Sequence, residues 1–319
     1  MAEWISLHAF HRGGTDRLIA QAVGGLVRSL DADGLLARWF FLRYWEGGPH
    51  LRLRLLPAAR AGEVEQRARA ALERHLSAHP SRVPWDPARY AAAAESFAAA
   101  EDLSGYDRRL RGHDVVEAVA YRPEHRVFGG PEVTGAAERH FGDSSRIALA
   151  LLERGEERGR RLGFAAAALM LALALWEPDP ARLGRALETS RDRWDPPATR
   201  AGRAGLLDGQ RPASNAQVLR CLRIATGLER PEPRDPVGAW WRSMVALHER
   251  VLTCRAAGRF HPEPADSSFH PPGASRAHGD VLILLVRCVH LLCNRLGLTG
   301  PEEAHLRYLI GTTLIELTA

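Results

Sequence analysis

The amino-acid sequence predicts an α+β fold, in which a mixed N-terminal half, residues 1–130, packs with a mostly helical half, residues 131–319. Short β-prone runs bounded by glycine and proline occur in the first half. In the second half, apolar residues recur at helical spacing. The chain has 319 residues and is 45% hydrophobic. It can therefore bury a full-sized core, and we expect the two halves to form one integrated unit.

Periodicity and turn residues locate the elements of the first half. In chain order we expect a strand over Trp4–Ala9, a helix over Thr15–Leu30, strands over Trp39–Trp45 and His50–Leu56, a helix over Glu63–Ser77 and a strand over Val115–Tyr121. This β-α-β-β-α-β order is that of a ferredoxin-like arrangement. An insertion over Pro84–Arg111 carries a further helix, Ala88–Glu101.

A series of helices is expected after residue 130. They cover Glu132–Phe141, Ser144–Glu157, Leu162–Trp176, Pro180–Arg191, Ser214–Thr226, Val237–Ala257, Asp280–Leu296 and Glu302–Leu317. Two stretches, Trp194–Pro212 and Phe260–Gly279, interrupt them. The second is rich in proline, serine and histidine, and we interpret it either as a loop beside a functional surface or as a tolerated insertion.

Arginine supplies all 43 basic residues, because the sequence contains no lysine. Schiff-base chemistry through a lysine of this chain is therefore excluded. Guanidinium groups bind carboxylates and amide oxygens, so the net charge of +5 favours an acidic or carbonyl-rich ligand. The arginines are interspersed with acidic residues and form no long basic run, which disfavours nucleic acid as a partner.

Cysteine spacing and hydropathy restrict the location of the protein. The four cysteines show neither CxxC spacing nor a pattern of metal ligands, so we expect buried free thiols and no metal site. The longest apolar run, Leu162–Trp176, is typical of a buried helix and not of a membrane span. The N-terminus shows no signal-peptide pattern. These features predict a cytoplasmic protein that does not bind membranes.

The most informative segment is the expected hairpin FFLRYWEGGPHLRLR, residues 40–54. Alternation along its second strand separates two sets of side chains: Leu51, Leu53 and Leu55 on one face, and His50, Arg52 and Arg54 on the other. The leucines would anchor the sheet to helices. The imidazole and the two guanidinium groups could clamp a carboxylate or stabilise an enolate oxygen. A solvated outer sheet face has the same pattern, so both interpretations stay open.

Two further segments carry candidate functional groups. YRPEHRVFGG, residues 121–130, follows a strand and ends in a glycine pair; such ends often bear catalytic groups, although the glycines alone need only positive φ. VHLLCNRLGL, residues 289–298, ends an apolar helix, with Gly297 as its C-cap. His290 and Asn294 are four residues apart and share a face. His290 is either an acid–base group or a hydrogen-bonded core residue.

These three segments, together with AERHFGDSS at residues 137–145, resemble the thiopeptide-type bacteriocin biosynthesis domain. That domain is also the C-terminal elimination domain of class I lanthipeptide dehydratases. The resemblance covers most of the chain; the first motif is specific, and the helical middle is diverged. It implies one integrated catalytic unit that acts on a ribosomal precursor peptide with a leader, together with other enzymes of the same pathway. A homodimer is compatible with this reading.

The resemblance also implies two sets of site residues. The catalytic set is His290, Arg52, Arg54, His50 and Tyr44. The substrate-binding set is Arg43, Tyr121, Glu124, Arg126, Asn294 and Arg295. A histidine would transfer protons, and the arginines or the tyrosine would stabilise negative charge on an oxygen. No metal or organic cofactor is implied.

Family members catalyse one of two reactions. Some remove glutamate from glutamylated Ser or Thr, which gives dehydroalanine or dehydrobutyrine. Others, the pyridine synthases, join two dehydroalanines by a formal 4+2 aza-cycloaddition, with loss of water and of the leader peptide. Where an RYGG segment would place arginine, this sequence has Val127, with Arg122 and Arg126 nearby. A carboxylate contact for elimination is thereby in doubt, so we expect a pyridine synthase. Glutamate elimination is the alternative, and a non-catalytic subunit that presents the precursor peptide is a second one.

Overall fold

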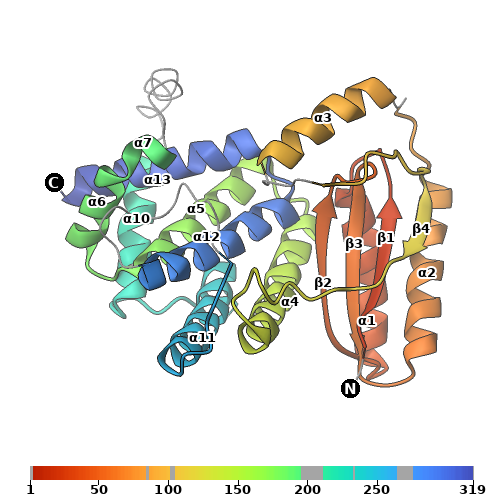
Figure 1. Ribbon diagram of the computed structural model, residues 1–319, viewed down its shortest axis with the longest axis horizontal. Coiled ribbons are helices and arrows are strands. Elements are labelled where there is room, and N and C mark those ends of the chain that lie inside the picture. The colour runs from red at the N-terminus through yellow and green to blue at the C-terminus, as the bar shows by residue number, and fades with distance from the viewer. Residues whose placement is uncertain are drawn as a thin grey trace. The chain divides into compact units, whose positions relative to one another are not determined.

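The computed structural model describes residues 3–83, 86–100, 105–194, 211–232, 234–263 and 276–318. A four-stranded antiparallel sheet is followed along the chain by helices, so the predicted α+β class is confirmed (Figure 1). The chain divides into two compact units: Met1–Arg122 with Ala148–Gly155, and Pro123–Ile147 with Glu156–Ala319. The boundary at residue 130 and the single integrated catalytic unit stay predictions.

The first unit contains the sheet and the helices near it in the sequence. Its strands are β1 (Ile5–Phe10), β2 (Leu36–Tyr44), β3 (His50–Pro57) and β4 (Val115–Ala118), in the order β2-β3-β1-β4 with every neighbouring pair antiparallel. Its helices are η1 (Leu18–Val23), α1 (Gly24–Ala32), α2 (Ala61–Ala78) and α3 (Pro87–Ala100). The strand expected over Val115–Tyr121 is shorter than predicted, because its pairing with β1 ends at Ala118.

The alternation predicted for β3 separates the two faces of the sheet. Leu51, Leu53 and Leu55 have no exposed surface. Helix α1 directly continues η1, and α2 packs beside them; α1 and α2 contact the strands and cover one face of the sheet (Figure 1). Burying three leucines against these helices contributes roughly 1.5–3 kcal/mol for each side chain. The residues between the leucines consequently point to the opposite face.

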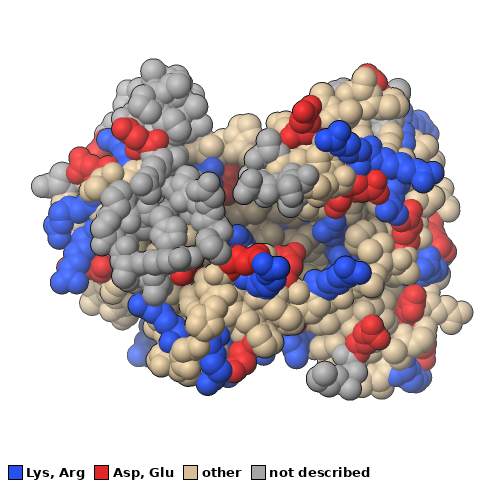
Figure 2. All heavy atoms as spheres, viewed as in Figure 1, with Lys and Arg blue, Asp and Glu red and all other residues tan. Residues whose placement is uncertain are grey.

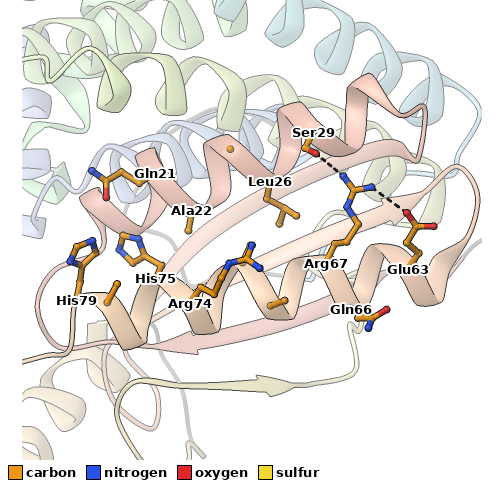
Figure 3. A pocket seen from close by; sticks show the side chains of 14 residues that line it. Gln21, Ala22, Leu26, Ser29, Glu63, Gln66, Arg67, Arg74, His75 and His79 are labelled. Carbon is orange, nitrogen blue, oxygen red and sulfur yellow. Dashed lines mark hydrogen bonds and ion pairs between the residues drawn. The ribbon is translucent and has the colours of Figure 1, made fainter.

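A groove runs between α2 and the continuous helix formed by η1 and α1 (Figure 3). Small residues such as Ala22, Ala70 and Ala71 line it. Arg67 on α2 donates to Ser29 Oγ on α1 at 2.6 Å and to Glu63 Oε1 at 3.2 Å. The bond from Arg67 to Ser29 therefore bridges the two helices beside the groove.

The inserted helix α3 and the segment after it fix the turn between β2 and β3. Tyr90 accepts a hydrogen bond from the Gly47 amide at 2.7 Å and donates to the Asp107 carbonyl at 3.2 Å. The Asp107 amide donates to Glu46 Oε1 at 2.8 Å. The turn is held by partners from a distant part of the chain, so the strand that follows it begins from a fixed point.

The second unit is helical. Its elements are α4 (Pro131–Glu153, which continues into the first unit), α5 (Arg158–Trp176), α6 (Pro180–Thr189), α7 (Arg191–Trp194), α10 (Arg211–Ala225), α11 (Pro236–Ala256), α12 (Arg276–Leu296) and α13 (Gly300–Thr318). Helix α5 contacts α6, α10, α11, α12 and α13. Among the described helices, α5 is the one long and apolar enough to cross a membrane, and 67% of its most apolar window is buried. Its place at the centre of the unit accounts for this apolar composition.

Several predicted boundaries of the helical half were wrong. One helix, α4, replaces the two expected over Glu132–Phe141 and Ser144–Glu157. An interior glycine such as Gly142 costs only about 1 kcal/mol, which buried positions on either side of it offset. Helices α10 and α12 begin earlier than expected, at Arg211 and Arg276. The rest of the two predicted interruptions, residues 195–210 and 264–275, lies outside the described residues. The four cysteines are free and buried, as predicted.

Candidate active site

Two histidines and two arginines form a compact group on the sheet face opposite the helices; we call His8, His50, Arg52 and Arg54 the sheet group. Antiparallel pairing sets His8 of β1 opposite Arg52 of β3. The rings of His8 and His50 stack with centroids 4.8 Å apart. Both imidazoles are buried, with exposed fractions of 7% and 2%. The sequence therefore predicted that the β3 members share one face of the sheet, but it did not indicate their partner on β1.

Each histidine of the sheet group accepts a hydrogen bond from one arginine. Arg52 Nε lies 3.2 Å from His50 Nε2, and Arg54 Nη2 lies 3.1 Å from His8 Nε2. A guanidinium can only donate, so both Nε2 atoms are unprotonated acceptors. His50 Nδ1 is 2.9 Å from the Gly48 carbonyl and donates to it. The ring orientation of His50 is thereby fixed from both sides.

Burial and positive neighbours keep these imidazoles neutral. Burial, followed by the charge of Arg54, lowers the pKa of His8 to about 2. Burial also lowers the pKa of His50 to about 4, against the opposing effect of its bond to Gly48. A base this weak is poorly suited to proton transfer near pH 7. The geometry instead gives both histidines the role of holding the arginine side chains.

Aromatic and acidic groups complete the surroundings of the two arginines. The Arg52 guanidinium lies 3.4 Å from the ring centroid of Tyr44, and its Nη2 is 3.4 Å from Glu46 Oε2. The Arg54 guanidinium lies 5.5 Å from the ring centroid of Tyr121. Cations over aromatic faces gain about 0.5–2 kcal/mol when partly desolvated. The structure thus brings predicted residues of the hairpin segment 40–54 and of the segment 121–130 into one cluster.

Arg43, which was predicted to bind substrate, lies on the other face of the sheet. Its position on β2 pairs with Leu51, whereas Tyr44 pairs with His50. Arg43 Nη2 forms an ion pair with Asp16 Oδ1 at 2.6 Å, and Nη1 donates to Thr15 Oγ1 at 2.5 Å. Strand alternation therefore separates Arg43 from the sheet group, and the geometry does not support its predicted role.

A second polar group lies in the helical unit, where α12 and α13 meet. His290 Nδ1 is 2.8 Å from Glu303 Oε2, and Arg307 Nη1 is 3.3 Å from Glu303 Oε1. The His290 side chain is 55% exposed, whereas that of Glu303 is 12% exposed. Burial raises the pKa of Glu303. The hydrogen bond and charge of His290, with the charge of Arg307, lower it by a larger amount, so the pKa lies below its ordinary value. An ionised carboxylate that orients an exposed imidazole is an arrangement suited to acid–base chemistry.

Arg295 does not share this exposure. It is fully buried, and its guanidinium donates to Ser145 Oγ at 3.1 Å and lies over the Phe141 ring. Burial lowers its pKa to about 9. The side chain has no surface with which to bind a peptide, so the predicted substrate contact is not supported. Asn294 is half-buried on the same face of α12 as His290.

The segment at 124–130 is pinned to residues 259–263. The His261 and Glu263 amides donate to the carbonyls of Gly129 and Arg126 at 2.9 and 2.8 Å. Gly129 has φ +79°, and a Cβ there would lie 2.6 Å from the Phe260 ring. This glycine is therefore required for close packing as well as for the turn. Arg126 forms an ion pair with Glu263 and is exposed, as is Glu124.

Sequence reasoning missed His8, Glu303 and Arg287. His8 alternates with Leu7 and Ala9 on an apolar strand, a signal that the pattern of β1 contained. Glu303 is 13 residues from His290, across a turn between two helices, and no local spacing indicates the pair. Arg287 donates to the Val127 carbonyl at 3.2 Å.

Charged side chains of both signs are interspersed on the visible face (Figure 2). The described residues contain no group of three or more His, Cys, Asp or Glu that could hold a metal ion.

Comparison with known proteins identifies the family. Residues 4–314 match the family described as lantibiotic biosynthesis dehydratase C-term, so the chain belongs to this family. A search of curated proteins gives no match.

Solved structures that share the fold include three described below. One is the pyridine synthase TbtD from thiomuracin biosynthesis, with a TM-score of 0.77, 19% identity and 99% of each chain covered. TsrL has a TM-score of 0.71 and 19% identity, covering 99% of this chain and 95% of its own. The tRNA-dependent lantibiotic dehydratase MibB from Microbispora sp. 107891 has a TM-score of 0.51 and 21% identity, covering 98% of this chain and 28% of its own.

Proposed function

We propose that this chain is a pyridine synthase that acts in the cytoplasm on a ribosomally made precursor peptide, without a metal or organic cofactor. It would join two dehydroalanines and release water and the leader peptide. The observation that carries this proposal is the length of the match to the pyridine synthase TbtD. That match covers 99% of this chain and 99% of the TbtD chain. The dehydratase MibB is matched over only 28% of its chain, although this chain is covered at 98%.

The sheet group would activate the peptide for ring formation. One dehydroalanine amide must become its iminol tautomer, which makes a 2-azadiene. Negative charge then develops on the amide oxygen, and Arg52 and Arg54 would stabilise it. His8 and His50 each accept a hydrogen bond from one of these guanidinium groups, which helps to fix the direction of both groups. Pre-set donors of this kind do not reorganise during the reaction.

His290 and Glu303 would transfer the protons. Two carbon–carbon bonds form in the cycloaddition, and the hydroxylated ring then loses water and the leader as its carboxamide. Each loss removes one proton from the ring system and delivers one to a leaving group. Nδ1 of His290 bonds to Glu303, and Nε2 would be the atom that exchanges protons with the peptide. Holding both dehydroalanines in reacting geometry would supply the remaining, entropic part of the rate enhancement.

A second candidate function, glutamate elimination, is favoured by one specific observation. The Arg287 guanidinium lies beside the Val127 carbonyl, in the segment where the sequence has no arginine in its GG motif. A glutamyl carboxylate could be bound there. The same two polar groups would then stabilise the charge next to the α-proton and protonate the departing glutamate.

Mass spectrometry of two peptide substrates distinguishes the reactions. One peptide carries glutamylated serine, and the other carries two preformed dehydroalanines. A pyridine product with loss of water and a freed leader carboxamide supports the proposal. Release of glutamate with gain of dehydroalanine replaces it by elimination. If both peptides are bound and returned unchanged, the chain is a presenting subunit.

A further inference from the structure

Arg287 is a positively charged residue that the sequence pattern did not single out and that the ring-forming chemistry proposed above does not use. It lies on α12, three residues before His290, and therefore on the same side of the helix. Its guanidinium donates to the Val127 carbonyl and lies 6.0 Å from the ring centroid of Phe128. The side chain is half-buried. One of its five N–H donors is thus occupied by a fixed backbone oxygen.

The charge of Arg287 has no ion-pair partner among the described residues of the helical unit. Glu124 is close enough to act on it electrostatically, but forms no salt bridge with it there. Burial lowers the pKa of Arg287, and the charge of Glu124 opposes this effect. Arginine still stays protonated at neutral pH. A half-buried cation of this kind gains most from an anionic oxygen brought by a ligand.

The position of Arg287 is fixed by the packing around it. The segment at 126–130 is paired with residues 261–263 and held close to Phe260. The Val127 carbonyl is therefore a rigid acceptor, and it directs one edge of the guanidinium toward the loop. Arg287 shares its helix face with His290 and Asn294.

We propose that Arg287 binds an anionic oxygen of the peptide substrate next to His290. The inference rests on the proposed function, because the bound peptide is the substrate of that reaction. Two sources share this oxygen chemistry: the amide oxygen that becomes negative during ring formation, and the carboxylate of a glutamyl group. An arginine here would stabilise the oxygen while His290 moves the proton.

Binding of two non-reacting probe peptides tests the inference without turnover. In the first, a phosphinate replaces the reacting amide; in the second, diaminopropionate carries a glutamyl group in amide linkage. Each is compared with an otherwise identical unmodified peptide by calorimetry, on the wild type and on Arg287→Gln. We expect the wild type to prefer one probe by at least about 100-fold, and Arg287→Gln to lose most of that preference.

The controls separate folding from recognition. Arg230→Gln removes an exposed arginine of the same unit and should leave the preference unchanged. Arg287→Lys keeps the positive charge without the planar fork and should keep part of the preference for the probe. This variant replaces Arg287→Gln in the test if Arg287→Gln misfolds. If Arg287→Gln loses the preference for the phosphinate probe, the bound oxygen is the amide oxygen. If it loses the preference for the glutamyl probe, the bound oxygen is the carboxylate. Equal preference in wild type and variants overturns the inference. Absence of pyridine product from the wild type defeats the proposed function instead, so the two failures are distinguishable.

Discussion

The sheet group and the pair on α12 and α13 use histidine in opposite ways. On the sheet, His8 and His50 are buried among arginines, and the pKa values of both are far below the ordinary one. On the helices, His290 is more than half exposed and faces the carboxylate of Glu303. A buried imidazole next to a cation is a hydrogen-bond acceptor, whereas an exposed one next to an anion can carry a proton. The two environments therefore suit the first pair to positioning the arginines, and His290 to the proton transfer that we propose for it.

The largest expected effect tests the proton-transfer side of this contrast. His290→Gln should lower kcat by about 100-fold to 10,000-fold, because general acid–base catalysis is lost. Peptide affinity should stay within a few-fold. Glu303→Gln should cost less, about tenfold, and move the acid limb of the pH–rate profile to lower pH, since the imidazolium loses its carboxylate partner. Steady-state kinetics against pH measure both. An unchanged kcat in His290→Gln would remove it from the mechanism.

The next effect tests charge stabilisation by the sheet group. Arg52→Gln and Arg54→Gln should each lower kcat by about 100-fold to 1,000-fold, as loss of an oxyanion donor does. His8→Gln keeps an acceptor for Arg54 and should retain most activity. His8→Phe keeps only the ring stack with His50 and removes that acceptor, so it should retain less activity than His8→Gln. A raised KM with unchanged kcat would mean that the arginines bind ground state and transition state equally.

A smaller effect appears in stability against pH. The pKa values of His8 and His50 are about 2 and 4 in the folded state, below the ordinary 6.5. Between about pH 6.5 and pH 4 the unfolded chain binds protons that the folded chain does not. Stability should therefore fall as pH falls, by up to about 1.4 kcal/mol per pH unit for each histidine. His8→Phe should flatten this slope in urea unfolding series at pH 4.5 to 7. His113→Gln, at an exposed position, is the matched control; equal slopes in all three proteins would contradict buried neutral histidines.

The smallest effect concerns Arg43, on the other face of the sheet from the group. Arg43→Gln removes a partly exposed ion pair with Asp16 and should cost about 0–1 kcal/mol of stability. The kcat and KM should stay within about twofold, because strand alternation places Arg43 on the other face of the sheet from Arg52 and Arg54. A loss comparable to that of Arg52→Gln would show that strand alternation alone does not define the functional face.

The sequence by itself determined the fold class, the family and the two faces of β3. These follow from local patterns: apolar periodicity, turn residues, and the alternation that places Arg52 and Arg54 together. The tertiary structure decided which side chains meet across distance. It paired His8 with Arg54, Glu303 with His290 and Arg43 with Asp16. It also made α4 one helix and buried Arg295 completely. Burial and long-range pairing set charge state and exposure, and neither property is encoded in the spacing of residues along the chain.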